Sequence, residues 1–279
     1  MKQEPRFKPN EWALILGASS GFGGAAAMEL ARAGMNVFGV HLDRQATMGS
    51  VQQIMKEIKH TGREAIFFNI NAADAIKRAE TLDEIQERFA GSNNTIRLLL
   101  HSLAFGTLKP FIAKRPEDAV SQAQMEMTID VMANSLVYWA QGLFSRSLIK
   151  RGGRIFAMTS SGSHTAIPNY GAVSAAKASL ESHIRQLALE LGPYGITANA
   201  IMAGVTDTPA QRKIPGAAQM LDVARRKNPS GRLTTPEDIA KAIVLFADET
   251  AHWLSGNVLG VDGGEDIVSY IGQKSATEL

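Results

Sequence analysis

The chain has 279 residues, of which 29 are basic and 27 acidic, giving a formal net charge of +2. It has no run of like charge that would indicate binding to nucleic acid or to a membrane surface, and the absence of cysteine excludes disulfides, thiolate metal sites and cysteine nucleophiles. Residues 1–10 form a polar N-terminal tail without an apolar signal region, and no apolar run approaches the ~18 residues of a membrane span, so we expect a cytoplasmic protein.

Short apolar runs alternate with helical patterns over residues 11–279, which we interpret as a single domain. The predicted strands are residues 12–18, 36–42, 65–70, 97–102, 154–159, 197–202 and 257–261. The predicted helices are residues 23–33, 48–60, 76–89, 125–148, 174–191 and 236–246. Nearly continuous apolar strands that alternate with helices are typical of a parallel sheet covered by helices on both faces. With right-handed crossovers, this predicts an α/β fold with a Rossmann-like, doubly wound parallel sheet of about seven strands.

A glycine-rich loop follows the first predicted strand and opens a helix. Its glycines permit a tight turn and a close approach of the backbone to a pyrophosphate, and the helix N-terminus favours that anion. Glycines also make ordinary turns between strands and helices, but here they follow the first strand of an alternating pattern, which indicates nucleotide binding. The loop residues expected to contact the cofactor are Gly17, Ser19, Ser20, Gly21, Phe22 and Gly23.

The next two strand ends carry candidate contacts to the adenosine half of a cofactor. An acidic residue after the second strand would bind the ribose of NAD, and an arginine would bind the 2′-phosphate of NADP. His41 occupies the usual position of the acid. Of the residues that follow, Asp43 indicates NAD and Arg44 indicates NADP. We favour NADPH over NADH, although all three side chains could be solvated loop residues. Asn69 and Ile70 end the third strand, where the amide of Asn69 could reach the adenine or satisfy local backbone.

Tyr170 and Lys177 are separated by seven residues. On a helix, residues seven apart return to roughly the same face, about 10 Å apart along the axis, whereas residues four apart lie about 6 Å apart. A tyrosine and a lysine on one face, downstream of a nucleotide loop, indicate reductase chemistry. The longer spacing changes which atom of a substrate the tyrosine meets.

Residues 205–235 break the alternation and are rich in proline, glycine, alanine and glutamine. An irregular stretch of that length is uncommon in a compact domain unless it is a lid or a binding loop. Because it follows a strand end, where ligands of such sheets bind, we predict a substrate lid rather than a simple surface excursion. No metal site is expected, since His164 and His183 lack the spacing of metal ligands.

Over about residues 11 to 266, these features resemble a short-chain dehydrogenase/reductase. The resemblance rests on the glycine loop, Ser160 after the fifth strand, Lys177 and the ending Val261-Asp262-Gly263-Gly264. Most members carry tyrosine four residues before the lysine, where this chain has Val173. Tyr170, seven residues before, is the arrangement of the enoyl-acyl-carrier-protein reductases. Other segments similar to that branch are residues 101–105, 168–170, 203–204 and 213–216.

Three departures define the subtype. The main bacterial enoyl reductases have an altered nucleotide loop, whereas this chain keeps GxxxGxG. They carry a second tyrosine where this chain has Ser160, which also matches the catalytic serine of ordinary members. Met132 stands at the position of those members' catalytic asparagine.

The resemblance implies NAD(P)H-dependent reduction of the C=C bond of a trans-2-enoyl thioester in fatty-acid synthesis, with the substrate on acyl carrier protein. Tyr170 would donate to the thioester oxygen, Lys177 would hold the nicotinamide ribose, and Ser160 would bind substrate or Tyr170, or would merely end its strand. Further cofactor contacts would come from Thr206 and Thr208, where members hold the carboxamide and pyrophosphate, and from Ser102, whose backbone passes the cofactor beside a structural His101.

The resemblance also implies a homotetramer with helices 125–148 and 174–191 at subunit contacts. The alternative activity is a ketone or alcohol oxidoreductase in which Ser160 and Tyr170 act on a carbonyl. A nucleotide-sensing protein that has lost catalysis is a further alternative, although intact Tyr170 and Lys177 argue against it.

Overall fold

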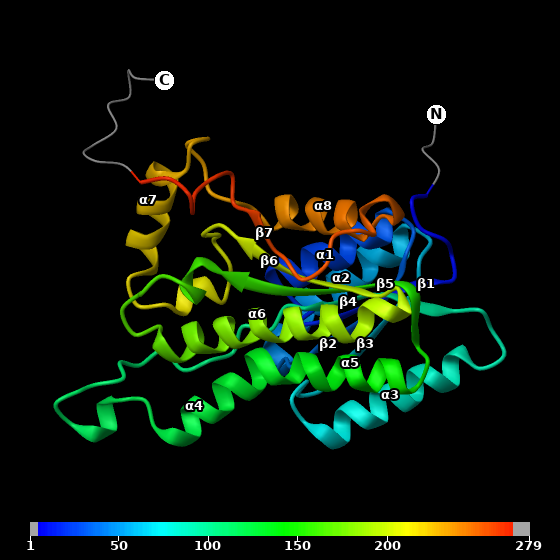
Figure 1. The fold of residues 1–279 in the computed structure, drawn as a ribbon, viewed down its shortest axis with the longest axis horizontal. Coiled ribbons are helices and arrows are strands. Elements are labelled where there is room, and N and C mark those ends of the chain that lie inside the picture. Colours follow the sequence, from blue (N-terminus) through cyan, green and yellow to red (C-terminus); the bar gives the residue numbers. More distant parts are fainter. Residues whose placement is uncertain (1–4, 270–279) are drawn as a thin grey trace.

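Seven parallel strands form one sheet in the order β3-β2-β1-β4-β5-β6-β7 (Figure 1). The computed structural model describes residues 5–269, so the ends of the predicted segments 1–10 and 11–279 lie outside the described residues. The strands are β1 Glu11–Leu16, β2 Asn36–His41, β3 Ala65–Asn69, β4 Thr95–His101, β5 Ile149–Ser160, β6 Thr197–Ala203 and β7 Val258–Val261. The predicted doubly wound sheet is therefore confirmed.

Helices cover both faces of the sheet (Figure 1). They are α1 Gly21–Arg32, α2 Met48–His60, α3 Ala75–Phe89, α4 Gln122–Ile129, α5 Ser135–Ser145, α6 Gly171–Leu191, α7 Ala217–Lys227 and α8 Pro236–Ala247. Alternate residues of β1 enter opposite cores, as the two-residue period of a strand requires. Leu14 packs with residues of α3, α5 and α6, and Ile15 packs with residues of α1, α2 and α8. Between residues 5 and 269, no helix is both long and apolar enough to cross a membrane.

The direction of winding reverses between β1 and β4, which are neighbours in the sheet. At the carboxyl ends of these strands, the Gly17 amide donates to Val40 O (2.8 Å) and the Ser102 amide donates to Leu16 O (2.9 Å). These bonds hold the loops after β1, β2 and β4 together. In open parallel sheets, ligands bind outside the carboxyl ends at such a reversal point. This edge of the sheet is therefore the candidate ligand-binding site.

The predicted helix 125–148 differs from the observed structure. A capping box between Ser121 and Gln124 starts α4 earlier, and a π-helical turn at Asp130–Asn134 separates α4 from α5. The helix ends at Ser145, and Ser147 adopts φ 55°. The extra residue in the π turn rotates α5 relative to α4.

Two further helix predictions require correction. The predicted helix 174–191 begins three residues earlier, at Gly171, so that Tyr170 becomes its N-cap. The stretch 205–235, in which we predict no regular element, contains α7. Gly216 precedes α7 with φ 80°, a conformation that glycine adopts without steric cost.

Candidate active site

The glycine loop is closely packed between β1 and β4. A Cβ on Gly17 would collide with the carbonyl of Ser102, and a Cβ on Gly23 would collide with the carbonyl of Gly17. Gly17 also has φ 91°. Ser20, the N-cap of α1, makes no side-chain hydrogen bond to the helix. The first amides of α1 are thus uncapped by this side chain and suited to an anion.

The loop after β2 is organised by a buried histidine. His41 is only 4% exposed, and its Nδ1 lies 3.0 Å from Asp43 Oδ2. Burial alone raises the pKa of the Asp43 carboxyl, but the nearby hydroxyls of Thr47 and Ser19 and the ring of His41 together hold it below its ordinary value. The Asp43 side chain is therefore an ionised carboxylate at neutral pH, just after the end of β2.

The remaining residues expected near the adenosine have different surroundings. The Asn69 side chain accepts from the Asp43 amide (3.0 Å) and donates to Asp43 O (2.9 Å), so it satisfies local backbone. Ile70 packs against the core, and its amide donates to His41 O. Arg44 is exposed and forms no ion pair among residues 5–269. Of these residues, Arg44 has the side chain most free to meet a phosphate.

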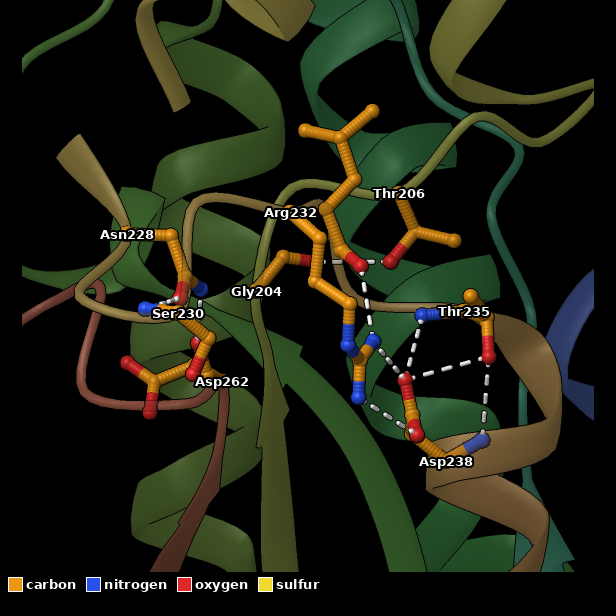
Figure 2. Close-up of polar contacts among 9 residues, drawn as sticks. Gly204, Thr206, Asn228, Ser230, Arg232, Thr235, Asp238 and Asp262 are labelled. Carbon is orange, nitrogen blue, oxygen red and sulfur yellow. Dashed lines mark hydrogen bonds and ion pairs between the residues drawn. The ribbon is translucent and has the colours of Figure 1, made fainter. Parts of the chain in front are cut away.

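The segment after β6 begins beside the end of β5 and reaches the glycine loop. Ala203 pairs with Ser160 at the carboxyl ends of β6 and β5. The hydroxyl of buried Thr206 donates to Gly204 O (2.9 Å) (Figure 2). Thr208 is buried against Gly21, where an added Cβ would lie 3.7 Å from its Cγ2. The structure therefore brings Thr208 to the nucleotide loop.

Tyr170 lies over the end of β5. It is the N-cap of α6, and its carbonyl accepts from the Ser174 amide (2.8 Å), which continues the helical geometry back to the tyrosine. The ring packs on Gly162, where a Cβ would lie 2.6 Å from Cε1 of the ring and 3.2 Å from Ser160 Oγ. Burial raises the pKa of the Tyr170 phenol, and the nearby Ser160 hydroxyl offsets part of the rise. Within residues 5–269, Ser160 Oγ itself is buried without a partner at hydrogen-bond geometry.

Lys177 is 5% exposed, and its Nζ donates to Met158 O (2.7 Å). Burial lowers the pKa of its ammonium to about 8, against the opposing effect of the Glu181 charge. Glu181 lies one turn further along α6 and accepts a hydrogen bond from the Thr159 hydroxyl (2.6 Å). Glu181 was not predicted from the sequence, although its position four residues after Lys177 on a helix indicates that the two side chains are neighbours.

His101 is fully buried, and its Nε2 lies 2.9 Å from Ser135 Oγ. Because the Ser135 hydroxyl donates to Val131 O, it accepts from Nε2 of the histidine. Burial and the charge of Lys177 lower the pKa of His101 to about 3. The ring is therefore neutral and joins β4 to the first residue of α5, which agrees with the structural role expected for it.

The carboxyl edge thus gathers the glycine loop, Thr208, Ser160, Tyr170 and Lys177. A family model described as enoyl-(acyl carrier protein) reductase matches residues 17–265.

Curated relatives fall into more than one activity class. An enoyl-[acyl-carrier-protein] reductase [NADH] from Nostoc sp. is 27% identical over 87% of this chain and 90% of its own. A cyclohexanol dehydrogenase from Rhodococcus sp. is 29% identical over 90% of this chain and 94% of its own.

Among solved structures, the enoyl-[acyl-carrier-protein] reductase (NADH) from Aquifex aeolicus VF5 superposes with a TM-score of 0.80. It is 23% identical, and the match covers 94% of this chain and 98% of that chain. At this identity the likeness supports the fold alone.

Proposed function

The chain belongs to the short-chain dehydrogenase/reductase family that the enoyl-(acyl carrier protein) reductase model describes, and within it we propose an enoyl-acyl-carrier-protein reductase. As a member, it is an NAD(P)-dependent oxidoreductase. The proposed reaction reduces the C=C bond of a trans-2-enoyl thioester in fatty-acid synthesis.

One observation carries this proposal: the placement of Tyr170 at the N-cap of α6, seven residues before Lys177. In ketone reduction, the proton donor must reach the oxygen on the carbon that accepts hydride. In enoyl reduction, charge develops on an oxygen two carbons further away. The seven-residue spacing moves the hydroxyl about 4 Å further along the helix axis than the four-residue spacing does, which suits the second case.

Each side chain has a task in this reaction. A bound nicotinamide supplies the hydride. Tyr170 donates a hydrogen bond to the thioester oxygen as that oxygen gains charge, and its raised pKa keeps the phenol protonated at neutral pH. Lys177 already binds Met158 O with one N–H, so two donors remain for the ribose hydroxyls of the cofactor. Its positive charge favours electron flow towards Tyr170.

Apolar surface near Tyr170 suits an acyl chain. The Phe111 ring packs over Gly171, the residue after the tyrosine, and is 51% exposed. Phe105, in the same loop after β4, is 62% exposed. Burial of such rings against methylene groups stabilises binding by the hydrophobic effect. We also propose that residues 205–235 form a lid over the bound substrate, as predicted from the sequence.

A second candidate is a ketone or alcohol oxidoreductase. In the described part of the chain, Ser160 Oγ is buried beside Tyr170 without a hydrogen-bond partner, so it is free to bind a carbonyl oxygen together with the tyrosine. The similarity to a cyclohexanol dehydrogenase supports this reading.

For the cofactor we propose a modest preference for NADPH. Arg44 is exposed and free to meet a 2′-phosphate, and this supports the preference. The Asp43 carboxylate, 15% exposed, lies one residue earlier and opposes it. The ratio of the two dissociation constants therefore reports which of these adjacent charges dominates.

We further propose that the substrate is carried by acyl carrier protein and that the enzyme is a homotetramer. Exposed Tyr138 and Phe144 on α5 and Leu189 on α6 give these helices apolar surface for subunit contacts. A cytoplasmic location remains a prediction.

The proposed reaction is tested by following oxidation of NADPH and NADH with crotonyl and acetoacetyl thioesters in parallel. Consumption with crotonyl alone is expected. Consumption with acetoacetyl alone would favour the ketone reductase, and cofactor binding without turnover of either would favour a sensing protein.

A further inference from the structure

The C-terminal turn (residues 262–266) holds three segments that surround the carboxyl edge. Asn228, just after α7, donates to Asp262 O (2.7 Å) (Figure 2). The Asp266 carboxylate lies 3.0 Å from His164 Nε2, in the loop after Ser160. The Val205 amide, directly after β6, donates to both carboxylate oxygens of Glu265 (3.3 Å each). One short turn therefore contacts the first residue of the stretch 205–235, Asn228 within that stretch, and the loop that follows Ser160.

The turn itself is closed by hydrogen bonds to the Asp262 side chain. The Asp262 carboxylate accepts from the amides of Gly264 (3.0 Å) and Asp266 (2.7 Å). Next to it, Arg232 pairs with Asp238 at the N-terminus of α8 (Figure 2). A pocket of about 490 Å³ lies between these residues and the turn. None of the site residues predicted from the sequence lines this pocket, so it is separate from the proposed reaction site.

Glu265 is the buried member of the turn, with 7% exposure. Its only hydrogen-bond donor among the described residues is the Val205 amide. A Cβ on Gly204 would lie 3.0 Å from Glu265 Oε2, so the carboxylate fills the space beside this glycine. Burial raises the pKa of the Glu265 carboxyl; the Val205 amide and the Lys227 charge lower it, and Asp262 and Asp266 raise it. A buried acid with one donor is costly, which points to a role other than stabilising the fold.

The segment that Glu265 holds connects the end of β6 with the nucleotide loop. It begins beside Ser160, through the pairing of Ala203 with that residue. Three residues after Val205 it reaches Thr208, which contacts Gly21 of the nucleotide loop. A dinucleotide lying between the glycine loop and the tyrosine would therefore run along residues 205–208.

We propose that Glu265 is a positioning residue for the cofactor: by accepting the Val205 amide, it fixes residues 205–208 in the conformation that the nicotinamide end requires. This proposal rests on nicotinamide binding, which family membership supports, and not on the enoyl substrate. It can therefore fail or succeed independently of the proposed reaction.

Two substitutions of similar size separate the acceptor role from packing. Glu265→Gln retains an oxygen for the Val205 amide, whereas Glu265→Leu fills the space without an acceptor. We expect Glu265→Leu to raise the Kd of NADPH and of NADH about tenfold, the effect of one lost hydrogen bond. Glu265→Gln should bind both cofactors within about twofold of wild type. Glu237→Gln, at an exposed glutamate of α8, is the matched control.

Cofactor fluorescence titration measures the Kd values, and thermal unfolding confirms that each variant is folded. Unchanged affinity in a folded Glu265→Leu variant, or equal losses in the Gln and Leu variants, would overturn the proposal. Amide hydrogen exchange of the wild-type protein gives a second test that needs no variant. The Val205 amide should exchange slowly and more slowly still with NADPH bound, and fast exchange in both states would overturn the proposal.

Discussion

Tyr170→Phe removes one hydroxyl and leaves the ring packed on Gly162. Among residues 5–269, the neighbouring Ser160 Oγ is already buried without a hydrogen-bond partner in the wild type. The substitution therefore leaves no newly orphaned group, and we expect a stability change within about 0.5 kcal/mol. The loss of a donor aimed at a developing oxyanion typically lowers kcat by about 10² to 10³, equivalent to about 2.7–4 kcal/mol. We expect kcat for crotonyl thioester to fall by this factor while the Kd of the cofactor stays constant.

The assay follows oxidation of the reduced cofactor at saturating concentrations of both substrates, with the Kd measured separately by fluorescence. Tyr194→Phe removes the same hydroxyl from a tyrosine that is 54% exposed at the far end of α6 and should leave kcat unchanged. If folded Tyr170→Phe retains kcat within about threefold of wild type, Tyr170 does not donate to the transition state, since such a loss is below about 0.7 kcal/mol.

Three other perturbations test separate parts of the site. Lys177 is charged below its pKa of about 8, and the Glu181 charge raises this pKa. Glu181→Gln removes that charge, so the fall of kcat/KM at alkaline pH should begin at a lower pH. An unchanged pH profile would show that Lys177 does not control this fall. Gly23→Ala forces a methyl group against a carbonyl of the glycine loop and should weaken cofactor binding at least about tenfold. Unaltered cofactor affinity in a titration would contradict this expectation. Arg44→Ala should weaken NADPH more than NADH, whereas Asp43→Ala should tighten NADPH; equal effects on the two cofactors would exclude both charges from contact with the 2′-phosphate.

The central strands were predictable because they are apolar runs that the sheet buries on both faces, whereas the edge strand β7 is only partly buried. Asn36–His41, for example, is buried at every position, so composition alone marks it. The helix boundaries were less predictable. Gly171 disfavours a helix by its propensity, yet α6 includes it because the Phe111 ring occupies the space that a side chain would need. That contact joins residues far apart in sequence and leaves no local signal.

The missed helix α7 does carry a local signal. Ala217, Met220, Leu221 and Ala224 recur at helical spacing, but only Ala224 is buried, and the preceding Pro215-Gly216 is typical of a turn. The π turn at Asp130–Asn134 is hidden within an otherwise continuous helical pattern.

The candidate site was predictable where its chemistry depends on spacing. The glycine loop, Tyr170 and Lys177 follow from residue type and interval, and the structure brings them to one edge. The surroundings that tune them were not predictable. Glu265 accepts a hydrogen bond from Val205, which is sixty residues away in sequence. The side-chain amide of Asn69 is hydrogen-bonded to the backbone of Asp43. Such contacts arise only from the tertiary fold.

In the proposed reaction, hydride is added to the β-carbon of an enoyl thioester. Incubation of the enzyme with crotonyl thioester and a reduced cofactor that carries deuterium at its transferable position tests this claim. We expect a butyryl thioester with one deuterium at the β-carbon, as read by NMR. Absence of this product, together with deuterium on the carbinol carbon of the 3-hydroxybutyryl thioester formed from acetoacetyl thioester, would contradict the claim and identify a ketone reductase.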